Sequence, residues 1–264
     1  YKYVFSGSVR RDRSSKFGPD KRAGWFYSGS LAWNLTEEEF MKNISWLNIA
    51  KLRASYGVTG NDQIGNDYAW ISSISSDQNV VFGNTAISTY YPSGYSNRQL
   101  GWEKNKQIDL GFDIGIFNAL NVVVDFYKRT SDIVMPANIP NFNGISGSVY
   151  MNAGQIENKG IEIQVSATPF KGEFSWETTL SWSKNNNILS LANNQNQLAN
   201  AKAGTKWSNV IRNYVGRPMG DMYMLKVIGT FNTEEDLAKY ATNGTQGIGD
   251  LIFEDYKKDG TIDV

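Results

Sequence analysis

The sequence predicts an all-β fold built from an antiparallel sheet, and three observations carry this prediction. Apolar residues recur at every second position through much of the chain. The connections between these alternating segments are short and long in turn. The longest unbroken aliphatic stretch runs only from Val122 to Val124, whereas a membrane-spanning helix needs roughly 18 apolar residues. This observation does not exclude a transmembrane β-barrel, because alternating strands never produce a hydropathy block.

The clearest strand covers Ile108 to Phe117, where isoleucine, leucine and phenylalanine alternate with aspartate and glycine. Strict alternation of this kind predicts a strand with one apolar and one polar face. A second alternating run, Leu120 to Phe126, follows after a very short connection and predicts a tight hairpin. The same pattern predicts about seven strands, near residues 1–10, 24–35, 48–59, 105–117, 120–130, 159–169 and 173–186.

The predicted connections differ in length in a regular way. Long polar stretches cover residues 11–23, 60–104, 131–158 and 187 onward. Thr36 and Glu39 have the spacing of a capping box, so we expect about one helical turn in the medium connection there. Long loops at one end and short turns at the other are typical of bacterial outer-membrane barrels. A soluble β-sandwich gives no reason for this regularity.

Alternation alone does not decide which face of the sheet meets water. A membrane barrel has a polar lumen and an apolar exterior, whereas a soluble barrel or sandwich buries its apolar face. Aromatic residues near the predicted strand ends favour the membrane barrel, because such rings form girdles at the two interfaces. These residues are Trp25, Tyr27, Trp33, Tyr56, Trp176 and Trp182. The alternative is a soluble or surface-attached β-sandwich that binds glycans and packs these rings in its core.

The composition excludes several classes of function. The 264 residues include 26 Lys and Arg, 26 Asp and Glu, and neither histidine nor cysteine. A net charge of zero argues against a nucleic-acid-binding protein, which needs a basic surface. Without cysteine and histidine the chain offers no disulfide, no thiol nucleophile and no imidazole base. Carboxylate pairs alone can serve a hydrolase, but no pair stands out, so we predict no catalytic residue and no enzyme.

Several motifs in order resemble one known family. The stretch Ser8 to Trp33, SVRRDRSSKFGPDKRAGWFYSGSLAW, resembles the corresponding segment of SusC/RagA-type TonB-dependent outer-membrane receptors. The resemblance continues through LNIAKLRASYGVTGNDQIGNDY, LGWEKNKQIDLGFDIGIFN, DFYKRTSDIV and NAGQIENKGIEIQVSATP. It ends with YVGRPMGDMYMLKVIGTFNTEED and GDLIFEDYKKDGTID, so that it covers essentially the whole chain.

The resemblance implies the C-terminal part of a 22-stranded transmembrane β-barrel, with residues 1–264 as a partial barrel domain. Residues 187–264 would be a long extracellular loop region within it, and the plug, the TonB box and the closing strands would lie outside this sequence. The implied function is the import of oligosaccharides or peptides across the cell outer membrane. The implied partners are TonB, a SusD-like surface lipoprotein and outer-membrane lipid.

The candidate ligand-binding residues are aromatic side chains in the long loops. Aromatic rings stack on sugar or peptide faces, and the surrounding amides orient a ligand by hydrogen bonds. The candidates are Trp70, Tyr90, Tyr91 and Trp102. The alternative is that these rings pack the loops against each other or against a partner lipoprotein.

One stretch near the end of the chain has the spacing of a calcium loop. Asp255, Asp259 and Asp263 occupy the first, fifth and ninth positions, and Gly260 stands at the sharp turn. Lys257 occupies the third position, where a ligand oxygen is expected. We therefore expect either a Ca²⁺ site or a solvated Asp/Gly turn, and no other cofactor.

Overall fold

The computed structural model describes residues 1–138, 148–192, 211–222 and 224–262. The chain divides into two compact units. The first comprises Tyr1–Leu198 with Tyr214–Met219, and the second comprises Ala199–Asn213 with Gly220–Val264. Within the described ranges, no helix is both long and apolar enough to span a membrane.

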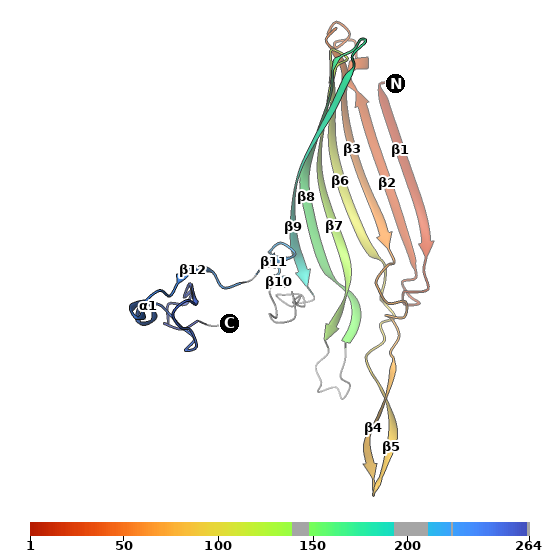
Figure 1. The fold of residues 1–264 in the computed structure, drawn as a ribbon. Coiled ribbons are helices and arrows are strands. Elements are labelled where there is room, and N and C mark those ends of the chain that lie inside the picture. The colour runs from red at the N-terminus through yellow and green to blue at the C-terminus, as the bar shows by residue number, and fades with distance from the viewer. Residues whose placement is uncertain (139–147, 193–210, 223, 263–264) are drawn as a thin grey trace. The chain divides into compact units, whose positions relative to one another are not determined.

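The first unit contains one seven-stranded antiparallel sheet (Figure 1), with the strand order β1-β2-β3-β6-β7-β8-β9. The strands are β1 (Tyr3–Arg13), β2 (Ala23–Asn34), β3 (Leu47–Asn61), β6 (Glu103–Ile116), β7 (Leu120–Asn138), β8 (Ser148–Phe170) and β9 (Trp176–Ala192). Each of the seven predicted strands corresponds to one of these elements. The all-β, antiparallel fold class is therefore confirmed.

The cross-strand register gives the sheet one apolar and one polar face. One row of paired residues crosses all seven strands through Tyr3, Trp33, Leu52, Phe112, Val124, Ile163 and Trp182. The adjacent row on the other face contains Arg53, Gly111, Asp125, Glu162 and Ser183. The apolar face is not covered, since Phe5 is 79% exposed and Leu180 is 70% exposed. Because exposure of apolar surface to water is unfavourable, this face is expected to be covered by another apolar surface or an apolar medium.

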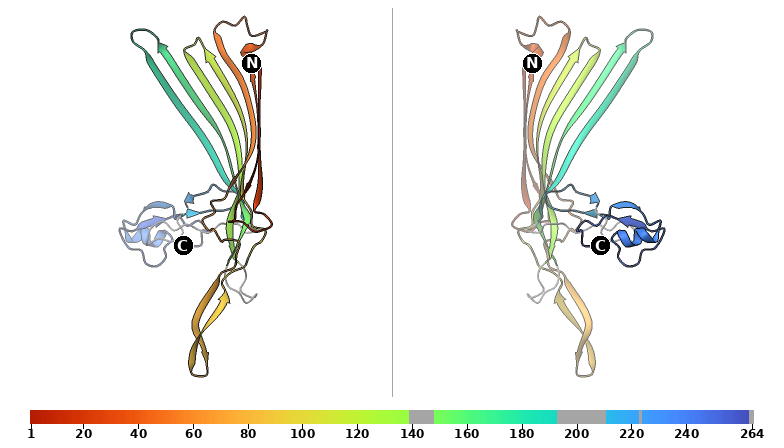
Figure 2. Two further views of the ribbon diagram at one scale, coloured as in Figure 1. Left: turned by 90° about the vertical axis from the view of Figure 1, so that its right-hand side faces the viewer. Right: turned by 90° about the vertical axis from the view of Figure 1, so that its left-hand side faces the viewer.

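Short and long connections lie at opposite ends of this sheet (Figures 1 and 2). Residues 35–46, 117–119 and 171–175 form the short connections. The β6–β7 turn places Phe117 and Asn118 at φ of 53° and 51°, and the Ala119 N–H donates to the Ile116 carbonyl at 3.0 Å. Positive φ at both central residues is the type I′ geometry that matches the twist of paired strands.

The predicted capping box at Thr36 and Glu39 is wrong. The connection contains a single 3₁₀ turn, η1 (Leu35–Glu37), whose N-cap Asn34 makes no side-chain capping bond. Glu39 instead forms an ion pair with Lys42 at 2.7 Å. Glu38 accepts hydrogen bonds from Trp33 and Tyr3, so the local carboxylates are used to hold β1, β2 and the turn together.

Three of the predicted long loops contain strand. Residues 131–138 and 148–158 continue β7 and β8, and β9 extends to Ala192 rather than ending near residue 186. Apolar alternation fades there, with a bulge between Ile133 and Val134, but backbone pairing does not require apolar side chains. The predicted 60–104 loop contains a hairpin of β4 (Ile74–Phe82) and β5 (Thr85–Pro92), which turns at Gly83.

The second unit is small and mostly irregular. It contains β10 (Ile211–Arg212), β11 (Asp221–Met222), β12 (Val227–Thr230), α1 (Glu234–Lys239) and β13 (Leu251–Phe253). Phe231 is fully buried and Ile252 is nearly so, which gives the β12–β13 pair a minimal core. Helix α1 begins with a true capping box, in which Thr233 and Asp236 bond each other's backbone N–H groups.

Acidification is expected to loosen helix α1. The backbone N–H of Asn232 donates to Asp236, and this bond, with a second from Thr233, lowers the pKa of the Asp236 carboxyl. A lowered folded-state pKa contributes stability that is present above the unfolded value of about 3.9 and is lost as pH falls through the folded value. Amide-exchange protection of α1, corrected for intrinsic pH dependence, should fall in that window. Asp236→Asn should remove the dependence, and an unchanged pH profile in that variant would refute the assignment.

Candidate functional site

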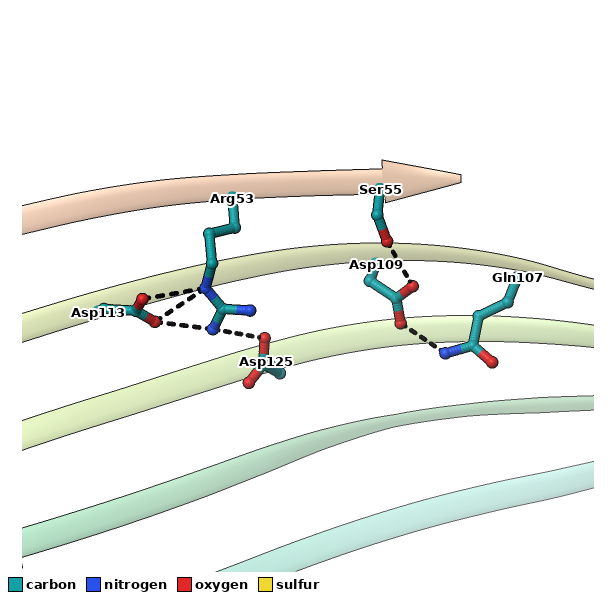
Figure 3. Close-up of polar contacts among 6 residues, drawn as sticks. All are labelled: Arg53, Ser55, Gln107, Asp109, Asp113 and Asp125. Atoms are coloured by element: carbon teal, nitrogen blue, oxygen red, sulfur yellow. Dashed lines mark hydrogen bonds and ion pairs between the residues drawn. The ribbon is translucent and has the colours of Figure 1, made fainter. Parts of the chain in front are cut away.

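The polar face of the sheet carries an ion-pair network at its centre (Figure 3). The Arg53 Nε donates to both Asp113 carboxylate oxygens at 2.9 and 3.1 Å, and its Nη2 lies 2.7 Å from Asp113 Oδ1. The same Nη2 lies 2.9 Å from Asp125 Oδ1. One guanidinium from β3 therefore joins carboxylates from β6 and β7, and its fixed fork suits two acceptors at once.

Gly111 makes this arrangement sterically available. It lies between Arg53 and Asp125 in the register of the three strands. A Cβ at this position would lie 2.4 Å from Asp125 Oδ1 and 2.7 Å from Arg53 Cζ. The Arg53 side chain thus crosses β6 over a position that has no side chain of its own.

A second network continues along the same face. The Ser55 hydroxyl donates to Asp109 Oδ2 at 2.8 Å, and the Gln107 amide donates to Asp109 Oδ1 at 2.7 Å (Figure 3). The Arg129 Nε then donates to the Gln107 carbonyl oxygen at 3.2 Å. The Tyr127 hydroxyl donates to Asn185 across Gly160, where a Cβ would lie 2.8 Å from the Tyr127 oxygen.

Except for Asp113, these side chains line an open hollow of about 470 Å³ on the polar face, together with Asn158 and Glu162. The lining of the hollow contains amide and hydroxyl groups as well as positively and negatively charged side chains. Such a lining can hydrogen-bond polar solutes or a polar protein surface. The alternation in the sequence predicts that these strands have a polar face, but it does not predict how the charged side chains on that face pair.

The predicted ligand-binding residues fall into two places. Trp102 packs against Phe17 and Phe26, with ring centroids 5.0 and 5.2 Å away, and its Nε1 donates to the Arg22 carbonyl at 3.0 Å. Trp70 lies under the Arg22 guanidinium. Both tryptophans pack against one hydrophobic cluster, whose buried members are Phe17, Ala69 and Leu100. Both tryptophans thus help to hold the loops together.

Tyr90 and Tyr91 lie elsewhere, on strand β5 of the β4–β5 hairpin. Tyr90 is 75% exposed and Tyr91 is 44% exposed. They pair with Ser76 and Ser75, and as neighbours on one strand they point to opposite faces of the hairpin. The structure therefore brings Trp70 and Trp102 together and leaves the two tyrosines accessible on a separate element.

The predicted calcium positions form a turn whose carboxylates bond the backbone. Asp255 accepts from the Lys258 and Gly260 N–H groups at 2.6 and 2.8 Å, and Asp259 accepts from the Thr261 N–H and hydroxyl. Asp263 lies outside the described residues. Within the described ranges, no group of three or more carboxylates is placed to hold a metal ion.

The sheet has an uncovered apolar face, a polar opposite face and long loops at one end. This combination is typical of the wall of an antiparallel membrane β-barrel. Residues 2–255 match the family model described as TonB dependent receptor-like, beta-barrel. The chain belongs to this family.

Two curated relatives illustrate the similarity. TonB-dependent receptor P39 of Formosa agariphila is 36% identical over 241 residues, which cover 90% of this chain and 22% of the relative. TonB-dependent receptor SusC of Bacteroides thetaiotaomicron is 29% identical over 273 residues, which cover 97% of this chain and 27% of the relative. The chain thus spans about a quarter of the length of these relatives.

Solved structures show the same fold. The RagAB peptide importer in its open-open state superposes with a TM-score of 0.73 at 24% identity, over 88% of this chain and 24% of the other. The RagAB peptide transporter gives a TM-score of 0.70 at 26% identity, over 86% of this chain and 24% of that one. The resemblance to SusC/RagA-type receptors is confirmed. The relatives are transport receptors rather than enzymes.

Proposed function

We propose that this chain forms part of the barrel wall of an outer-membrane transporter that imports oligosaccharides or peptides. The observation that carries the proposal is the sidedness of the seven-stranded sheet. Its apolar face is exposed on successive strands, and its polar face holds the hollow lined by Arg53, Asp109 and Arg129. A wall between lipid and an aqueous interior requires this combination.

The remaining parts of the proposal follow from the family. The relatives include SusC and the RagAB peptide importer, so the substrate is an oligosaccharide or a peptide. A SusD-like lipoprotein would work at the surface, and TonB would supply energy through a region outside this sequence. The end of the sheet that carries the long connections and the β4–β5 hairpin would face outward. The uncovered apolar face disfavours the soluble sandwich alternative.

Localisation and uptake test this function in the full-length protein. We expect the protein to co-sediment with outer-membrane markers and to need detergent for extraction. Deletion of its gene should abolish growth on one oligosaccharide or peptide mixture as sole nutrient source, and the intact gene should restore it. A protein found in the soluble fraction, or growth unchanged across all nutrients, would contradict the proposal.

Tyr90 and Tyr91 remain the better placed candidates for ligand contact, because both rings are accessible. Tyr90→Ala with Tyr91→Ala is expected to weaken substrate binding by about fivefold for each stacked ring removed. Calorimetric titration of the full-length protein with the substrate found above measures this. Tyr68→Ala is the matched control, since Tyr68 is a loop tyrosine that is 73% exposed. Equal affinities in all three proteins would assign the two tyrosines to another role.

Calcium binding at the Asp255 turn also stays a proposal, with Asp255, Asp259 and Asp263 as the ligands. Ca²⁺ would replace or supplement the backbone bonds that the carboxylates now make. Titration of the metal-free, full-length protein with Ca²⁺ should give a binding isotherm that Asp255→Asn abolishes. The absence of binding heat at millimolar Ca²⁺ would leave a solvated turn.

A further inference from the structure

The exterior face of the sheet carries lysines at one boundary of its apolar band. On four consecutive strands, the first charged residue that follows the apolar positions toward the long loops is a lysine. We name these residues the lysine row: Lys106 on β6, Lys128 on β7, Lys159 on β8 and Lys184 on β9. Each lies two positions beyond an apolar residue on the same face, namely Ile108, Phe126, Ile161 and Trp182.

The register of the lysine row follows the tilt expected of barrel strands. Lys128 lies directly opposite Lys159. Lys106 pairs with Thr130, which lies two residues from Lys128 toward the long loops. Lys184 pairs with Ile161, which lies two residues from Lys159 toward the short turns. The offsets run in one direction across the sheet. Side chains at one membrane depth on tilted strands must be offset in this way.

The lysine row is only half compensated within the chain. Lys106 lies 3.2 Å from Asp132, and Lys128 lies 2.9 Å from Glu157. Across the ranges that the structure describes, Lys159 and Lys184 form no ion pair. Like charges placed directly opposite on neighbouring strands destabilise a sheet. Lys159, which lies opposite Lys128 and has no carboxylate partner of its own in the described ranges, is therefore expected to need an anion from outside the chain.

We propose that the lysine row binds the phosphate groups of anionic lipid headgroups in the leaflet at the long-loop end. A single lipid satisfies both halves of this surface, because its acyl chains cover Phe126, Ile161 and Trp182 while its phosphate meets Lys159 and Lys184. The ammonium group of lysine is a point charge suited to phosphate. The inference rests on the proposed function, since it requires this face to contact a bilayer.

The test compares lipid binding by the full-length protein and two variants in mild detergent. The probes are a diphosphorylated glycolipid, phosphatidylcholine and inorganic phosphate. Lys159→Gln with Lys184→Gln removes the two uncompensated charges and leaves an uncharged polar side chain at each position. Lys51→Gln is the matched control, because Lys51 lies on the polar face opposite Asp113. Native mass spectrometry counts the bound lipid, and fluorescence titration gives its affinity.

The double variant is expected to lose about fivefold in glycolipid affinity for each lysine, or about 25-fold in all. Lys51→Gln should bind like the unmodified protein, phosphatidylcholine should bind weakly to all three, and added salt should weaken only the glycolipid complex. Equal affinity in the double variant and the unmodified protein would overturn the proposal. So would tight binding of inorganic phosphate without the glycolipid, or an equal loss in Lys51→Gln.

Membrane fractionation separates this proposal from the function beneath it. A protein absent from the outer membrane refutes both. A protein present in the outer membrane, and active in uptake, whose double variant retains glycolipid at the unmodified affinity refutes the lysine row alone.

Discussion

Val124→Arg is expected to lower the stability of the membrane-inserted protein by about 2–4 kcal/mol, whereas Val123→Arg should change it little. The two valines are neighbours on β7 and point to opposite faces. Val124 lies on the apolar face between Phe112 and Ile163, midway between Leu120 and Lys128. A charge there must enter lipid. Val123 lies between Asp113 and Gln164 on the polar face, where an added guanidinium meets water and a carboxylate.

Urea titration of the full-length protein folded into lipid vesicles measures both free energies. Both variants replace a valine of β7 with arginine. Any difference between their free energies of unfolding is therefore due to the face of the sheet on which the residue lies. Equal losses would mean that β7 has no lipid-facing side. A larger loss in Val123→Arg would mean that the faces are assigned the wrong way round.

Gly111→Ala is expected to cost about 1–3 kcal/mol, because the added methyl group cannot fit beside the Arg53 guanidinium without displacing it. The nearest groups would be Asp125 Oδ1 at 2.4 Å and Arg53 Cζ at 2.7 Å. Displacement of the guanidinium breaks the link between β3 and β7. Gly29→Ala is the matched control, since its nearest neighbour would be a carbonyl oxygen at 3.9 Å.

A double-mutant cycle identifies the cause of that loss. In an Arg53→Ala background the guanidinium is absent, so Gly111→Ala should cost less than it does in the unmodified protein. The expected coupling energy lies in the range of about 0.5–3 kcal/mol found for residues in contact. Strictly additive losses would show that the glycine serves the strand itself and not the arginine.

The strands were predictable because their signal is local. Ile108 to Ile116 alternates without interruption, and the structure pairs this segment with Leu120 to Lys128 as a hairpin around Phe117 and Asn118. Strand ends were less predictable, since residues 131–138 and 148–158 pair through their backbones while their side chains no longer alternate. The β4–β5 hairpin was missed although Gly83-Asn84 is a turn signal between two strand-like segments.

The networks on the polar face were not predictable from the sequence alone. Arg53 reaches Asp113 only because β3 pairs with β6, and residues 62–102 separate these two strands in the chain. A shift of one residue in that register would place Arg53 on the apolar face. Similarly, the capping box was expected at Thr36, whereas the structure forms one at Thr233, where Asp236 takes the place of the usual glutamate.

The sidedness of β7 is the central claim, and spin-label accessibility tests it most directly. The chain contains no cysteine, so single cysteines at positions 122 to 127 each give one label in this segment. In vesicles containing the full-length protein, labels at 122, 124 and 126 should be relaxed mainly by oxygen dissolved in lipid. Labels at 123, 125 and 127 should be relaxed mainly by a water-soluble nickel complex. Accessibility without this period of two, or with the two sets exchanged, would contradict the assignment of this sheet as a barrel wall.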